Sequence, residues 1–108
     1  VAIVDYNKKQ IDGPTDDVLS LGDLRAKYES FGWKVWECNG NDMQELVDTF
    51  NKIRENAHKG QSQILLAHTE MGMGVDFMMG THKWHGVAPN DEQAANALSQ
   101  LKETLGDY

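Results

Sequence analysis

The chain has 108 residues and a formal net charge of −7, with 10 lysines and arginines against 17 aspartates and glutamates. This length allows one modest core, so we expect one small domain or part of a larger one. The negative charge disfavours nucleic-acid binding, which needs clustered Lys and Arg. No stretch approaches the roughly 20 apolar residues that span a bilayer. Cys38 is the only cysteine, so an intrachain disulfide is excluded and a reducing cytoplasm is the expected location.

The first part of the chain predicts two strands with a helix between them. The apolar run at residues 2–4 is typical of a strand buried on both faces, and a turn at 12–15 follows it. Apolar residues recur at helical spacing after Asp23, and Gly32 stands where a left-handed cap is expected. Residues 33–38 are rich in aromatic and β-branched types and predict the second strand.

The second part predicts a helix, a strand, a long loop and a last helix. We expect Asn41 to cap the first of these helices, and residues 64–67 to form a third buried strand. Residues 70–89 form a long glycine-rich loop, a kind that usually has a function. We expect Asn90 to cap the last helix, which would continue through Leu105 to Gly106. The apolar stripe of the first helix consists of Met43, Leu46, Val47, Phe50, Ile53 and Ala57.

The alternation of strands and helices predicts an α/β fold, a parallel sheet with flanking helices. In such sheets ligands gather at the carboxyl ends of the strands. Asn7 directly follows the first predicted strand, and Glu70 follows the third. We therefore expect the polar segments that begin there to share one edge of the sheet and to form the binding site.

Asn7 offers a neutral carbonyl oxygen directly after a buried strand, and a polar turn follows it. Mg²⁺ and Ca²⁺ prefer oxygen ligands of this kind and readily share their coordination shell with phosphate oxygens. Considered alone, without the rest of the motif, Asn7 is better explained as an ordinary turn residue.

Four segments carry a resemblance to a known family. Residues 5–13 fit the pattern Asp-x-Asn-x-x-x-Ile-Asp-Gly, residues 31–35 fit Tyr/Phe-Gly-Trp-x-Val, residues 69–74 fit Thr-x-x-Gly-x-Gly, and residues 81–86 fit Ser/Thr-His-x-x-His-Gly. In this order the segments resemble the later part of the thiamine-diphosphate-binding domain of transketolases, and the likeness extends over nearly the whole chain.

The resemblance implies roles for five residues. Asn7 would bind Mg²⁺ (or Ca²⁺) through its side chain and Lys9 through its backbone carbonyl. Ile11 and Met71 would contact thiamine diphosphate, although Met71 is equally well explained as a core methionine. His85 would contact the diphosphate and the substrate and assist proton transfers, a task that suits a side chain with a pKa near neutrality.

The resemblance also implies an activity and partners. A transketolase transfers a two-carbon ketol unit from a ketose phosphate to an aldose phosphate in the pentose phosphate pathway. The family's Gly-Asp-Gly motif and pyrimidine domain are not found in residues 1–108, so we expect a partial cofactor-binding domain that is inactive alone. A split enzyme is the preferred interpretation, with a second subunit supplying the pyrimidine domain in a larger oligomer.

Three alternatives remain open at this point. A zinc site built from Cys38, His68, His82 and His85 is disfavoured because these residues lie on unrelated elements and no Cys-x-x-Cys pair accompanies them. A non-catalytic interaction or regulatory remnant of the domain would keep the fold without turnover. A sister family, such as the deoxyxylulose-phosphate synthases or the E1 components of keto-acid dehydrogenases, fits residues 11–13 and 82–86 less well.

Overall fold

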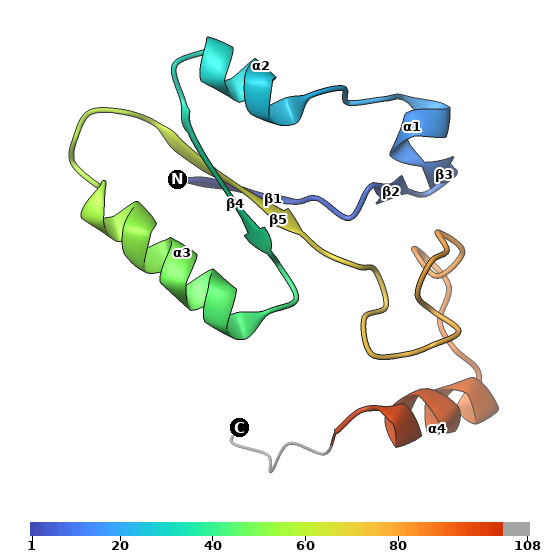
Figure 1. The fold of residues 1–108 in the computed structure, drawn as a ribbon. Coiled ribbons are helices and arrows are strands. Elements are labelled where there is room, and N and C mark those ends of the chain that lie inside the picture. Colours follow the sequence, from blue (N-terminus) through green and yellow to red (C-terminus); the bar gives the residue numbers. More distant parts are fainter. Residues whose placement is uncertain (103–108) are drawn as a thin grey trace.

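The computed structural model describes residues 1–102, and its centre is a three-stranded parallel sheet (Figure 1). The strands are β1 (Ala2–Asp5), β4 (Lys34–Asn39) and β5 (Gln63–His68), in the order β1-β5-β4. Both pairings are parallel, and the register places Leu66 of β5 between Val4 and Glu37. The predicted α/β class, with a parallel sheet and flanking helices, is confirmed.

The core lies on both faces of the central strand β5. Ile64, Leu65 and Leu66 are almost completely buried, and successive side chains point to opposite faces because a strand has a period of two. Ile64 and Leu66 pack with Leu24 and Tyr28 of α2 (Leu24–Ser30). Leu65 and Ala67 pack with Ile53 of α3 (Met43–Glu55). The two helices therefore cover opposite faces, as Figure 1 shows.

The first strand is an edge strand, so the prediction that it is buried on both faces was wrong. Its side chains alternate between partly buried and exposed, and Ile3 is 59% exposed. Ala2 and Val4 belong to the core on the α2 side, whereas Ile3 lies on the other face, which α3 covers only above β4 and β5. A continuous apolar run does not by itself reveal which neighbours will cover it.

The helix caps confirm the prediction for one helix and correct it for another. The Asp23 carboxylate accepts from the Ala26 amide at 2.9 Å and begins α2, and Gly32 has a φ of 80° directly after its end. At α3 the capping residue is Asp42, whose carboxylate accepts from the amides of Gln44 and Glu45. The prediction of Asn41 was wrong by one position.

The apolar stripe of α3 is only partly buried. Ile53 is buried and Leu46 packs beside it, whereas Met43, Val47 and Phe50 are exposed. A helix that crosses a sheet of three strands meets it along a narrow line, so the side chains beside that line keep their solvent contact.

A small unit that the sequence analysis did not predict follows β1. The two-residue strands β2 (Lys9–Gln10) and β3 (Gly13–Pro14) pair in antiparallel fashion, and α1 (Thr15–Val18) comes next. The amide of Thr15 donates to the carbonyl of Lys8 at 2.9 Å. This bond closes the segment after β1 into a compact turn.

The long loop and the last helix extend away from the sheet (Figure 1). No helix or strand occurs within residues 69–90, as predicted, and α4 (Asp91–Gln100) begins with a capping box formed by Asn90 and Gln93. Leu101 is extended, so α4 ends at Gln100 rather than continuing; Leu105 and Gly106 lie outside the described residues. Along residues 1–102, no helix has the length and apolar character needed to cross a membrane.

Candidate functional site

An open cavity of about 500 Å³ lies at the carboxyl ends of β1, β4 and β5. This is the edge where parallel sheets bind ligands, and the volume lies in the range of small-molecule sites. Each strand contributes the residues that follow it, so segments far apart in the sequence meet here. The lining residues are Tyr6, Asn7, Lys8, Lys9, Asn39, Asn41, His68, Thr69, Glu70 and Met73.

The turn after β1 lines this cavity with residues that carry oxygen ligands. The side-chain carbonyl of Asn7 accepts from the Lys9 amide at 2.9 Å, which folds residues 7–9 into a tight turn with Lys8 at a φ of 57°. A carbonyl oxygen has two lone pairs, so one such bond still permits a cation to bind it. The Asn7 oxygen and the main chain of Lys9 therefore fit part of the coordination shell of Mg²⁺ or Ca²⁺.

The donor set is incomplete for a metal held by protein alone. Across residues 1–102, no three or more His, Cys, Asp or Glu side chains come together in a way that could hold a metal ion. Two neutral oxygens bind a divalent cation weakly, whereas phosphate oxygens complete such shells readily. The chemistry of the turn thus fits a cation that arrives with a phosphorylated ligand.

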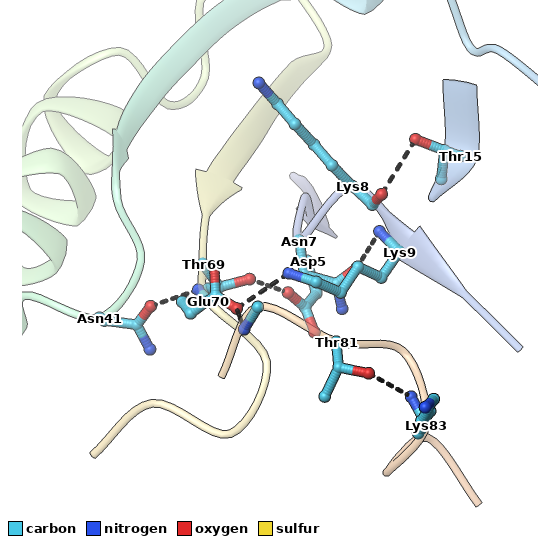
Figure 2. A network of polar contacts seen from close by, with 11 residues as sticks. Asp5, Asn7, Lys8, Lys9, Thr15, Asn41, Thr69, Glu70, Thr81 and Lys83 are labelled. Carbon is cyan, nitrogen blue, oxygen red and sulfur yellow. Dashed lines mark hydrogen bonds and ion pairs between the residues drawn. The ribbon is translucent and has the colours of Figure 1, made fainter. Parts of the chain in front are cut away.

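Two lysines give the cavity its positive charges. Lys8 Nζ lies 5.8 Å from the centre of the Tyr6 ring, and Lys9 Nζ donates to Glu70 Oε1 at 2.8 Å. The Lys9 ammonium, followed by the amide of Gly80, holds the pKa of the Glu70 carboxyl below its usual value. Figure 2 shows Lys9 and Glu70 pointing toward each other, with Thr69 and Asn41 beside them.

Polar contacts also join the ends of the three strands. The Thr69 hydroxyl donates to the Asp5 carboxylate, and the Asn41 side chain accepts from the Glu70 amide at 2.6 Å. At Gly40 an added Cβ would lie 2.5 Å from Thr69 Cγ2, so the connection after β4 lies directly against that after β5. The segments that form the wall of the cavity are therefore connected by hydrogen bonds and close packing.

His68 and Glu37 form a second polar pair at the rim, which the sequence analysis did not assign. His68 Nε2 donates to Glu37 Oε2 at 2.7 Å, and Arg25 Nε donates to Glu37 Oε1 at 2.5 Å. These two donors, His68 first, hold the pKa of the Glu37 carboxyl below its usual value. The sequence signal that could have indicated this pair is Glu37, a charged residue near the end of a largely apolar strand.

The structure brings some of the predicted site residues together and leaves others apart. Asn7 and Lys9 line the cavity, whereas Ile11, Met71 and His85 do not. Ile11 is 64% exposed, Met71 is half-buried, and His85 is exposed. Contacts of these three residues with a cofactor stay predictions.

The loop that carries the two predicted histidines has contacts of its own. The Trp84 indole donates to the Phe77 carbonyl at 3.0 Å, and the two rings pack edge-on with centres 5.4 Å apart. The His85 amide donates to the His82 carbonyl at 3.0 Å. Cys38, which the zinc alternative required, is instead buried in the core beside Ile53 and Leu65, as predicted for an inert thiol.

Comparison with known proteins gives one consistent result. Residues 1–106 match the family model described as "Transketolase, thiamine diphosphate binding domain". The chain is 39% identical to one subunit of the apulose-4-phosphate transketolase of Phocaeicola vulgatus, over 97% of this chain and 37% of that protein. It is 30% identical to the SqwG subunit of the 6-deoxy-6-sulfo-D-fructose transketolase of a Clostridium species, over 95% of this chain and 37% of that protein. The chain thus spans a little over a third of the length of these relatives.

Proposed function

Because this chain belongs to the family of transketolase thiamine-diphosphate-binding domains, we propose that it forms part of an enzyme that transfers a two-carbon ketol unit from a ketose phosphate to an aldose phosphate. The observation that carries the proposal is the cavity at the ends of three parallel strands, which is lined by Asn7, Lys8 and Lys9 of one tight turn. Oxygen ligands and positive charges together suit a diphosphate with its cation.

In this proposal Asn7 binds Mg²⁺ (or Ca²⁺) through its side chain and Lys9 through its backbone carbonyl. Ile11 and Met71 contact the cofactor, and His85 donates hydrogen bonds to the diphosphate and the substrate and moves a proton near the reacting carbonyl. Thiamine diphosphate, when bound, supplies the carbanion chemistry that breaks and makes the C–C bond. The protein groups orient it and exclude competing reactions.

Relatives whose names describe them as transketolase subunits suggest the type of partner. We propose that a second subunit supplies the pyrimidine domain in a cytoplasmic oligomer of the pentose phosphate pathway, and that the chain alone transfers no ketol groups. Transfer by the purified chain alone would contradict this point. A non-catalytic role is the second candidate, and the exposed edge strand with Ile3 on its surface favours it.

The test is a thermal midpoint measured on the protein that carries this sequence, together with its partner subunit. A ligand that binds only the native state raises the midpoint, so thiamine diphosphate with Mg²⁺ should raise it. Asn7→Ala should abolish most of the shift. Asn51→Ala is the matched control, because Asn51 lies on α3 and contacts Arg54, away from the cavity. An equal shift in wild type and Asn7→Ala would refute the assignment of Asn7, and no shift in wild type would favour the non-catalytic role.

A further inference from the structure

Glu70 joins three segments that the sequence keeps far apart. Its Oε1 atom accepts from Lys9 Nζ and from the Gly80 amide, each at 2.8 Å. Its own amide donates to the Asn41 side chain at 2.6 Å. The turn after β1, the connection after β4 and the far end of the loop therefore meet at one residue (Figure 2).

The charge of Glu70 matters because of Lys9. The Lys9 side chain is only 15% exposed, and that of Glu70 is 37% exposed. A lysine with so little solvent contact needs a partner of opposite charge. Hydrogen bonds between ionised groups are shorter and stronger than neutral ones, so loss of the carboxylate would leave the ammonium unpaired at the cavity wall.

The second contact of Glu70 restrains the loop. Gly80 has a φ of 71°, and an added Cβ would meet no atom within 4 Å. Packing around this position is therefore sparse, and the bond from the Gly80 amide to Glu70 is the polar contact that holds it. The Trp84–Phe77 contact connects the loop only to itself.

We propose that Glu70 is a positioning residue: it holds residues 80–86, with His82 and His85, against the turn that carries Asn7 and Lys9. Its role is to touch Lys9 and Gly80 rather than a ligand. The functional meaning of this role rests on the proposed function, in which His85 acts at the cavity. The contacts of Glu70 with Lys9 and Gly80 do not depend on that function.

Limited digestion with trypsin tests the proposal on the chain without any ligand. Lys83 lies in the restrained segment and is exposed, and Lys59 is exposed in the connection between α3 and β5. The ratio of cleavage after Lys83 to cleavage after Lys59 reports local opening of residues 80–86, because cleavage of a rapidly opening segment follows the population of its open form. A uniform loss of stability accelerates both cleavages and leaves the ratio unchanged.

Glu70→Ala removes both contacts of the carboxylate and should raise the ratio about fivefold, the equivalent of one lost hydrogen bond. Glu70→Gln keeps an acceptor for Gly80, and Lys9→Met removes only the ion pair, so each should raise it about twofold. Lys9→Arg should retain the wild-type ratio. Glu29→Gln, which alters an exposed ion pair with Arg25 on α2, is the matched control and should change nothing.

Two results would overturn the proposal. One is an unchanged ratio in Glu70→Ala, whether or not both sites are cut faster. The other is additivity in the double variant Glu70→Gln/Lys9→Met, because two groups that act through one contact should together have no more effect than either alone. Since no cofactor is present in the digestion, failure of thiamine-diphosphate binding and failure of the Glu70 proposal give separate results.

Discussion

The sheet with its two helices and the segment that follows it are held together by different forces. In the sheet body, formed by β1, β4, β5, α2 and α3, three consecutive residues of β5 are almost completely buried. In the arm, residues 69–102, only Val75 and Ala97 are buried, and polar contacts such as those of Glu70, Asp76 and Trp84 have a larger share in holding it. Apolar burial of one large side chain contributes about 1.5–3 kcal/mol, whereas a hydrogen bond contributes about 1 kcal/mol net.

The candidate site lies at the boundary between these two regions. Asn7 and Lys9 come from the turn that directly follows β1 of the body, and His82 and His85 come from the arm. Segments with few apolar contacts open locally at lower free energy than the core does. We therefore expect the body to carry most of the free energy of unfolding, and the arm to open and close without unfolding it.

Leu65→Ala should have the largest effect. Leu65 is 0% exposed and packs with Cys38, Ile53 and Ala67, so truncation should lower the free energy of unfolding by about 2–5 kcal/mol. The measurement is urea unfolding followed by circular dichroism.

The matched control for this variant lies in the arm. Leu98 of α4 is 71% exposed, and Leu98→Ala should change the free energy of unfolding by less than about 0.5 kcal/mol. Similar losses in the two variants would mean that α4 belongs to the cooperative core and that the division into body and arm is incorrect.

Gly72→Ala should open the arm. Gly72 has a φ of 74°, and an added Cβ would lie 2.5 Å from Met78 Cβ. Backbone strain and overpacking together should destabilise this part of the loop by about 2–4 kcal/mol. Hydrogen exchange of the Val75 and Met78 amides, which donate within the loop, should become much faster.

Gly32→Ala distinguishes strain in the body from strain in the arm. Gly32 has a φ of 80° with no atom near an added Cβ, so its substitution should cost about 1–2 kcal/mol in global stability. Gly72→Ala acts on the arm, which opens locally at a lower free energy than the body unfolds. Its effect on the global free energy of unfolding should therefore not exceed the free energy of that local opening. A larger global loss in Gly72→Ala than in Gly32→Ala would show that arm and body unfold together.

The difference between the regions also explains how much the sequence could predict. Strands β4 and β5, the ends of α2 and the cap of α4 follow local rules, namely apolar runs, Asp and Asn caps, and a glycine at positive φ. The exposure of Ile3 and Phe50 depends on how much of each sheet face a neighbour covers. No local pattern contains that information.

The same holds for the candidate site. Asn7 could be predicted because it follows an apolar strand within a recognisable motif, and it lines the cavity. The partners of Glu70 could not, since Lys9 lies 61 positions away in the sequence and the Gly80 contact depends on the path of an irregular loop. Sequence spacing indicates which residues follow a strand, but not which of them meet across the sheet edge.

The Glu37 carboxyl provides a pH test of the body. Because His68 and Arg25 lower its pKa in the folded state, its contribution is present above the unfolded pKa, near 4.5, and is lost as the pH falls through the lower folded value. Glu37→Gln should therefore reduce the dependence of stability on pH below about 4.5, by less than about 1 kcal/mol because the group is partly exposed. Urea unfolding between pH 3 and 6 measures this.

Glu29→Gln is the control for the pH test, because Glu29 contacts Arg25 at 3.0 Å but is not bonded to His68. Glu29→Gln should leave the contact between His68 and Glu37 in place, and with it the contribution of Glu37 to the pH dependence of stability. An equal change in both variants would assign the effect to Arg25 alone and not to the His68 contact.

Gln100→Ala should have the smallest global effect and the most local one. The Asp76 amide donates to Gln100 Oε1 and Gln100 Nε2 donates to Asp76 Oδ1, each at 2.8 Å, so this reciprocal pair fastens α4 to the loop. Both bonds are exposed, and their loss should change the free energy of unfolding by less than about 0.5 kcal/mol. Exchange of the Asp76 amide should nevertheless accelerate severalfold, whereas Ser99→Ala, whose hydroxyl bonds only within α4, should leave it unchanged. If Gln100→Ala left the Asp76 exchange rate unchanged, the burial of apolar side chains such as Ala97 and Val75 would be sufficient to hold α4. The arm would then resemble the body, which is held by apolar burial.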